Sequence, residues 1–236
     1  MLLEEMSWPE IQATLEKTKT VILPVGATEE HGPHLPVFTD TVEAVEVAKE
    51  AARRTGVLVA PEIPYGICRS TKGFPGTITI GFDALRLFAH DVLISLNDTG
   101  FNKIMVLTGH AGGQHVSALQ EACQNVAAER DVLVSLVSLF DLIDNSIVEA
   151  PNDGHSGEIE TALMLALRKN LVKGKPQANY PSRPRFLILR DVRRLMGNGI
   201  MGDPSRSSRE KGLTFFEMAV QGAMKALEEM NKHFSQ

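Results

Sequence analysis

The chain has 236 residues, of which 43% are apolar, and a formal net charge of −5 at pH 7. These values predict a single domain, residues 1–236, with one substantial core, and the lack of any basic block excludes a nucleic-acid partner. No apolar run reaches the roughly 20 residues of a membrane span, so we expect no membrane partner. The start MLLEEMSWPE does not resemble a signal peptide, and two cysteines are too few for a disulfide framework. We therefore expect a cytoplasmic protein.

Short apolar runs alternate with helical patterns along the chain. Strands are predicted at Thr20–Val25, Val57–Ile63, Thr77–Ile80, Lys103–Thr108 and within Asp131–Phe140. Helices are predicted at Thr41–Arg54, from Asp83 to Leu96, at Val116–Arg130, from about Gly157, and at Leu213–His233. This alternation predicts an α/β fold with a largely parallel sheet and helices on its faces.

The first predicted strand runs into a loop rich in carboxylates and imidazoles, namely Glu29, Glu30, His31, His34 and Asp40. Glu29 and His31 are two residues apart, so in an extended segment their side chains leave the same face. Asp40 follows two prolines that force a turn, and its two oxygens could bridge two cations. The alternative is that Asp40 only caps the helix Thr41–Arg54. The cluster as a whole predicts a metal site.

The central strand Lys103–Thr108 leads into a glycine-rich loop, GHAGGQH, that supplies another imidazole, His110. Gly112 and Gly113 allow the backbone to approach a ligand closely. Glycine-rich loops at helix starts also bind phosphate, but this loop lacks the G-x-G-x-x-G order and any P-loop lysine, which disfavours a nucleotide site. His115, at the start of the next helix, is predicted to be a surface or capping residue.

Further titratable side chains occur in the motif HSGEIET, which opens a helical pattern. Glu158 and Glu160 fall in the first helical turn, where the helix dipole alone would favour carboxylates. The adjacent His155 favours a functional interpretation. The long segment Gly197–Gly212 before the last helix is predicted to be a lid or an interface.

Five motifs, GATEEHGPHLPVFTDT, FPGT, TGHAGG, HSGEIET and GIMGDPS, together resemble the creatininase family over roughly residues 20–212. This resemblance implies an α/β/α fold with three layers, often assembled into homohexamers. It also implies an amidohydrolase that cleaves non-peptide C–N bonds by metal-bound hydroxide. The cofactors implied are two divalent metal ions per chain, and nitrogen and oxygen ligands suit Zn, Mn or Fe.

The resemblance also implies roles for individual residues. One metal would be held by Glu29, Asp40 and His110, and the other by His31, Asp40 and Glu160, with Asp40 as the bridge. Gly112 stands where creatininases proper have an acidic ligand, and Glu160 is the expected substitute. His155 matches the catalytic histidine, which would deliver a proton to the departing nitrogen with Glu160 beside it. The alternative is that His155 only orients Glu160.

The residues that would hold a substrate depart from the family pattern. Aromatic side chains are missing around His155, the only tryptophan is Trp8, and Thr71 replaces a histidine common among relatives. We therefore predict a small amide, formamide or cyclic amide as substrate. Creatinine itself, or a non-catalytic metal-binding oligomer, is the alternative. Candidate substrate-binding residues are Arg69, Lys72, Gly112, Gly113, Arg206 and Arg209; the four cations would otherwise be solvated surface charges.

Overall fold

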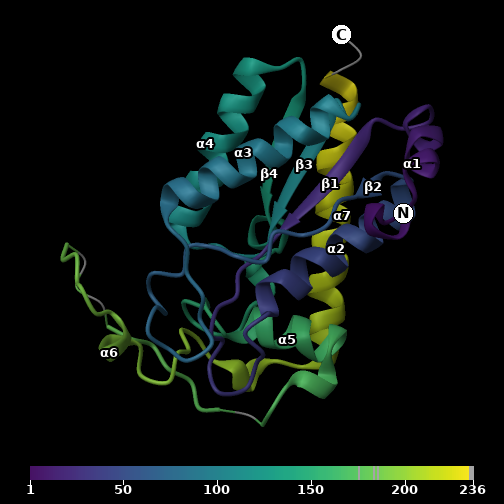
Figure 1. Ribbon diagram of the computed structural model, residues 1–236. Helices are drawn as coiled ribbons and strands as arrows, with labels where there is room; N and C mark the ends of the chain where they lie inside the picture. Colours follow the sequence, from purple (N-terminus) through teal and green to yellow (C-terminus); the bar gives the residue numbers. More distant parts are fainter. Residues whose placement is uncertain (175, 183, 185, 234–236) are drawn as a thin grey trace.

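The computed structural model describes residues 1–174, 176–182, 184 and 186–233. In this part of the chain the strands form one fully parallel sheet in the order β2-β1-β3-β4 (Figure 1). The strands are β1 (Thr20–Val25), β2 (Leu58–Val59), β3 (Lys103–Thr108) and β4 (Leu133–Ser138). The largely parallel α/β sheet predicted from the sequence is confirmed.

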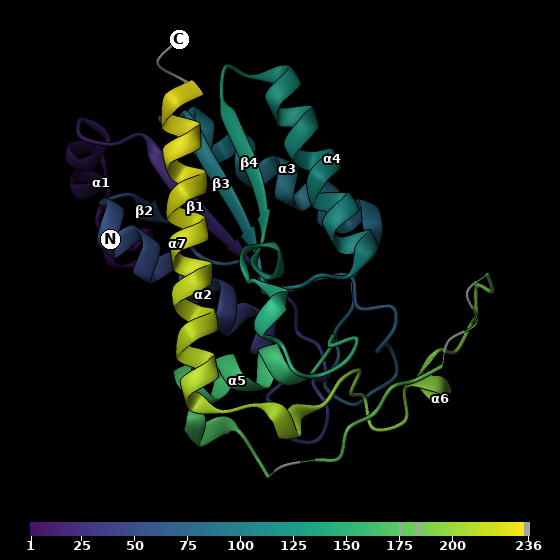
Figure 2. The same cartoon turned by 180° about the vertical axis from the view of Figure 1, so that it is seen from behind.

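Helices connect the strands and cover both faces of the sheet (Figures 1 and 2). The α-helices are α1 (Trp8–Leu15), α2 (Thr39–Thr55), α3 (Phe82–Asp98), α4 (Gly113–Glu129), α5 (Glu158–Leu167), α6 (Arg193–Met196) and α7 (Arg209–His233). Short 3₁₀ segments span Leu3–Glu5, Leu139–Leu142, Asn145–Ile147, Lys169–Leu171 and Pro204–Arg206. Among the described residues, no helix is long and apolar enough to cross a membrane.

Alternate residues of the central strands face opposite sides of the sheet and enter two separate cores. Ile22 of β1 and Met105 of β3 pack with α2, α5 and α7. Their neighbours Val21 and Ile104 pack with α3 and α4 on the other side. The sheet is thus the middle of three layers, and it is buried on both faces, as is usual for parallel sheets.

Two strand predictions need correction: one strand is shorter than predicted and the other does not form. The run Val57–Ile63 forms a strand only at Leu58–Val59, because Pro24 of β1 and Pro61 both lack the N–H that a longer ladder needs. Thr77–Ile80 is not a strand and makes only single bridges, one of them between Ile78 and Thr28. The five predicted helices correspond to α2, α3, α4, α5 and α7 to within a few residues at their ends, whereas α1 and α6 were not predicted.

The carboxyl ends of β1 and β3 lie side by side at the centre of the sheet. The chain leaves β1 toward β2 on one side and reaches β3 on the other, so this is the switch point where parallel α/β sheets bind ligands. The first turn of α2 rests directly on these strand ends. A Cβ at Gly109 would lie 2.1 Å from the Asp40 carbonyl oxygen, and one at Gly26 would lie 2.2 Å from Thr41 Oγ1. Only glycine permits this close contact.

Candidate active site

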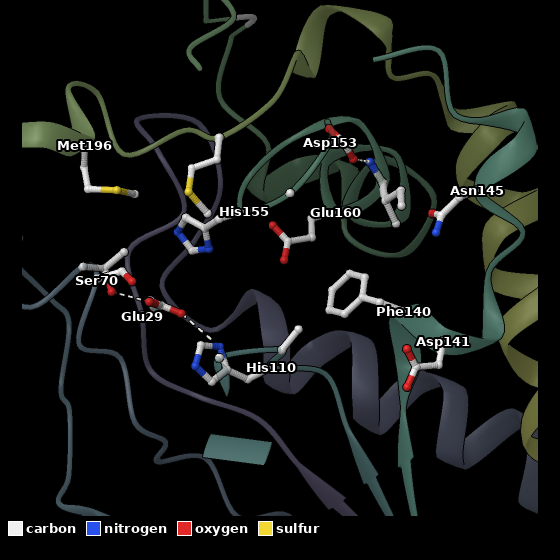
Figure 3. A pocket seen from close by; sticks show the side chains of 16 residues that line it. Glu29, Ser70, His110, Phe140, Asp141, Asn145, Asp153, His155, Glu160 and Met196 are labelled. Atoms are coloured by element: carbon white, nitrogen blue, oxygen red, sulfur yellow. Dashed lines mark hydrogen bonds and ion pairs between the residues drawn. The ribbon is translucent and has the colours of Figure 1, made fainter. Parts of the chain in front are cut away.

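A cavity of about 380 Å³ opens at this switch point (Figure 3). Glu29 comes from the loop after β1, His110 from the loop after β3, His155 from the turn just before α5, and Glu160 from the first turn of α5. Figure 3 shows these four side chains around one space, with Ser70 and Met196 on one side and Phe140 and Asp141 on the other. Parallel strand ends and a helix start thus bring together residues far apart in sequence.

Two buried histidines each use one ring nitrogen to bind the backbone. His31 Nδ1 lies 3.0 Å from the Glu29 carbonyl oxygen, and His110 Nε2 lies 3.2 Å from the Ile67 carbonyl oxygen. In the neutral ring, donation to these carbonyls fixes the tautomer and leaves the other nitrogen, Nε2 of His31 and Nδ1 of His110, with a lone pair that a metal can accept. Histidine ligands of metals are commonly oriented in this way.

Asp40 lies between these two histidines. Its Oδ1 is 2.9 Å from His31 Nε2, and its Oδ2 is 3.0 Å from His110 Nδ1. The capping alternative is not supported, because α2 begins after Phe38 without a side-chain cap and Asp40 lies inside the first turn. Each oxygen of this 1%-exposed carboxylate therefore faces a different imidazole.

Two further carboxylates complete two groups of donors. Glu29 Oε2 is 3.0 Å from His110 Nδ1, and Glu160 Oε1 is 3.7 Å from His31 Nε2. Three of these buried atoms, Glu29 Oε2, His31 Nε2 and Asp40 Oδ2, make no well-formed hydrogen bond among the described residues and face only the imidazoles and carboxylates of the cluster itself. Buried polar atoms are rarely left without a partner, so their convergence fits bound cations.

The electrostatics of the cluster reflect strong mutual interaction. Burial alone would lower the pKa of His31, but the carboxylates of Asp40 and Glu160 outweigh it and raise that pKa well above its usual value. Likewise burial would raise the pKa of Asp40, but the adjacent imidazoles lower it strongly. The cluster thus strongly favours positive charge between its carboxylates, whether supplied by protons or by metal ions.

His155 lies at the edge of the second group of donors. Its Nε2 is 2.7 Å from the Glu30 carbonyl oxygen, and its ring is 4.3 Å from that of His31. Its ring contributes to the cavity wall beside Glu160 (Figure 3). Ligand atoms of His31, His155 and Glu160 all lie within 4.8 Å of one another, so geometry permits either a proton-transfer or a ligand role for His155.

One residue near the first group was missed in the sequence. Ligand atoms of Glu29, Cys68 and His110 lie within 4.8 Å of one another, and Cys68 is buried. Burial raises the pKa of its thiol. A single cysteine in a turn-rich segment carries no spacing signal, so only the fold reveals its position. Thr71, from the same segment, donates a hydrogen bond to Glu29 Oε1.

Other polar residues of the motifs support the site from outside. Glu158 is fully buried away from the cavity, where it accepts the N–H groups of Glu149 and Ala150 and binds Lys211 Nζ at 2.6 Å. The prediction that His115 is a surface or capping residue is wrong. It is completely buried, and its ring contacts Thr108 Oγ1 at 3.2 Å and the Ile67 N–H at 3.4 Å.

The candidate substrate-binding residues are divided between different places. Gly112 lines the cavity, and a Cβ there would lie 2.6 Å from His110 Nε2, so glycine leaves room for the imidazole. Gly113 begins α4. The four predicted cations do not line this cavity: Arg69 and Lys72 line a neighbouring hollow, Arg206 lies 3.4 Å from Asp203, and Arg209 begins α7. The structure thus gives no support for substrate contacts by Arg206 and Arg209.

Comparisons with known proteins agree with this geometry. The creatininase family, described as creatinine amidohydrolase, matches residues 4–227. The chain is 30% identical to a creatinine amidohydrolase of Pseudomonas putida, with 95% of each covered. It is 34% identical to a mycofactocin precursor peptide peptidase of Mycolicibacterium smegmatis, with 86% of this chain and 81% of the relative covered.

Solved creatininase structures extend the likeness to three dimensions. A creatininase variant of Zn-Zn type has a TM-score of 0.89 at 27% identity, with 97% of each chain covered. A creatininase with Mn has a TM-score of 0.86 at 26% identity, again with 97% of each chain covered.

Proposed function

The chain belongs to the creatininase family of metal-dependent amidohydrolases, and from this premise we propose that its cavity hydrolyses a non-peptide C–N bond of a small amide, formamide or cyclic amide. The observation that carries the proposal is Asp40, whose two oxygens face two oriented imidazoles. We further propose that the chain acts as one catalytic domain, in the cytoplasm, within a homo-oligomer that the family resemblance makes a hexamer.

We assign two divalent cations to the two groups of donors. Glu29, Asp40 and His110 would hold one cation, and His31, Asp40 and Glu160 would hold the other. The convergence of buried carboxylate and imidazole atoms supports this assignment, and mixed nitrogen and oxygen donors suit Zn, Mn or Fe. Bound there, the cations would activate water and polarise the carbonyl of the amide.

The protein's own contribution is orientation and proton delivery. The backbone carbonyls of Glu29 and Ile67 hold the two imidazoles in place. The departing nitrogen needs a proton, because an amide anion is a very poor leaving group. His155 is the candidate donor: it lines the cavity, and the Glu30 carbonyl restrains its ring from behind. Such general acids contribute roughly 10²–10⁴-fold to the rate.

Creatinine is the second substrate to consider, because one of the similar proteins is named creatinine amidohydrolase. In the described part of the cavity wall, Phe140 is the only aromatic residue apart from the histidines. Trp8 is 75% exposed on α1, well away from the site. A flat ring would therefore find little stacking surface, and we expect creatinine to be a poor substrate. A purely structural, non-catalytic role is disfavoured by the full set of donors.

The test is a substrate screen with metal-loaded protein. Formamides, cyclic ureides, lactams, short peptides and creatinine should be compared for metal-dependent hydrolysis, with Asp40→Ala as the inactive control. Hydrolysis of a small amide at a rate well above that of creatinine would support the proposal. Cleavage of peptides alone would instead favour a peptidase like the mycobacterial relative.

A further inference from the structure

A second hollow, of about 590 Å³, lies beside the catalytic cavity. Three cationic side chains line it: Arg69, Lys72 and Arg190. We call it the cationic annex. The described residues of its wall include no carboxylate, and none of the three cations forms an ion pair with a described residue. Three unpaired cations around one concavity attract anions more strongly than isolated surface charges do.

The annex and the catalytic cavity share two walls. The first is the segment 68–72: Ser70 lines both hollows, Thr71 binds Glu29 in the cavity, and Arg69 and Lys72 face the annex. Neighbouring residues of this segment thus line one hollow or the other.

The second shared wall is α6. Leu195 lines the annex, while the next residue, Met196, lines the catalytic cavity on the same side as Ser70 (Figure 3). The guanidinium of Arg193 lies 4.9 Å from the centre of the Phe74 ring, and the Phe74 N–H donates to the Thr71 carbonyl, so α6 is held beside the end of the first wall. A molecule extending from the metal donors past Ser70 would therefore enter the annex.

We propose that the cationic annex binds an oxyanion, a carboxylate or a phosphate, at the far end of the substrate whose amide is cleaved in the catalytic cavity. The inference rests on the proposed function and narrows its substrate class to anionic amides. Arginine and lysine together suit such groups, because the guanidinium fork matches planar oxyanions and the ammonium supplies a compact charge. The anion would anchor the substrate without touching the reacting bond, so its effect should appear in KM.

The experiment compares matched amides that differ only in their far end: a neutral alcohol, a carboxylate or a phosphate. With metal-loaded protein, we expect the anionic amides to have KM values at least about tenfold lower than the alcohol. The double variant Arg69→Met/Lys72→Met should remove this advantage while leaving kcat and the neutral amide unchanged. The larger of the carboxylate and phosphate effects identifies the anion.

Arg194→Met is the matched control. Arg194 is an 88%-exposed cation on α6, the helix whose Leu195 lines the annex, but Arg194 itself does not line it. It should change nothing. Equal KM values for neutral and anionic amides in the unmodified protein would overturn the annex while leaving amide hydrolysis intact. The annex would also be overturned if the double variant raised KM equally for the neutral and the anionic amides.

If no amide is cleaved, the proposed function fails, and binding tests the annex by itself. The metal-loaded protein should bind glutarate or inorganic phosphate in a titration. The dissociation constant should rise about tenfold in the double variant and stay unchanged in Arg194→Met. The difference between variants removes any contribution from anions on the metals. Identical affinity in all three proteins would overturn the annex.

Discussion

Asp40 is the single residue shared by both proposed cation positions, since its two oxygens lie 2.9 and 3.0 Å from different imidazoles. Asp40→Ala should therefore remove most of both metal ions, whereas the loss of any other donor should affect mainly one. Elemental analysis of purified protein measures this directly. Asp83→Ala, at an exposed carboxylate on α3, is the control and should keep full metal content. Full occupancy in Asp40→Ala would rule out the bridge.

Two glutamates of one helical turn are predicted to behave differently. Glu160→Gln should weaken the position that includes His31 and leave the other largely filled. Glu158→Gln should keep both metals, because Glu158 binds Lys211 and two backbone N–H groups instead. Its loss should lower the free energy of unfolding by about 1–3 kcal/mol. Metal analysis and urea unfolding separate the two effects, and equal metal loss would contradict the assignment of Glu160.

His155 is predicted to act on the leaving group. His155→Ala should lower kcat by about 10²–10⁴-fold for a simple amide with metal content unchanged. The loss should shrink for an activated anilide, whose departing nitrogen needs less help from an acid. Kinetics with a series of leaving groups measure this. Loss of metal, or an equal cost for good and poor leaving groups, would show that His155 is a ligand or orients Glu160.

At the scale of elements, the contact between α2 and the strand ends controls where Asp40 lies. A Cβ at position 109 would meet the Asp40 carbonyl at 2.1 Å, so Gly109→Ala must displace α2 or the loop after β3. We expect a loss of about 1–3 kcal/mol in the free energy of unfolding, together with weaker metal binding. Urea unfolding and metal titration provide the two measurements.

Gly113→Ala, at the first residue of α4 just beyond this loop, is the matched control for this contact. A Cβ there meets nothing within 4 Å, so stability and metal content should be kept. Similar losses in both variants would mean that the loop needs flexible glycines in general rather than close contact at position 109.

For the whole molecule, the buried His115 makes stability depend on pH. Burial and the nearby His110 lower the pKa of His115 to about 3, against 6.5 for the free side chain. Between these two pKa values, His115 is protonated in the unfolded chain but neutral in the folded chain. This contribution is fully present above pH 6.5 and is lost as pH falls toward 3, by about 2 kcal/mol at pH 5.

Urea unfolding between pH 7.5 and 5 measures this loss. His115→Gln should reduce the acid slope, and part of the slope should remain because burial and His31 also lower the pKa of His34, to about 4. An unchanged slope in His115→Gln would contradict the assignment.

The sequence predicted local features better than contacts between distant segments. β3 was placed to the residue, because an apolar run bounded by turn residues has few alternatives. The sequence also singled out Glu29, His31, Asp40 and His110, whose residue types are those that metals require. Their meeting at one strand edge follows from the parallel sheet.

What the sequence did not reveal depends on tertiary contacts. His115 stands at a helix start, where exposure is common, but the loop at Gly66 and Ile67 covers it: a Cβ at Gly66 would lie 2.8 Å from its ring. Cys68 lies in an irregular segment without periodicity. Arg190 lines the annex together with Lys72. Such neighbours are far apart in the chain, so no local pattern predicts them.

The close packing of α7 on α5 has a consequence for how the site is made. A Cβ at Gly212 would lie 1.8 Å from the Ala162 carbonyl, and Lys211 binds Glu158, so the start of α7 holds the helix that carries Glu160. During translation, Glu29, Asp40 and His110 emerge long before α7. We therefore expect the proposed donor Glu160 to be held in place only after the last helix has been synthesised and has packed on α5.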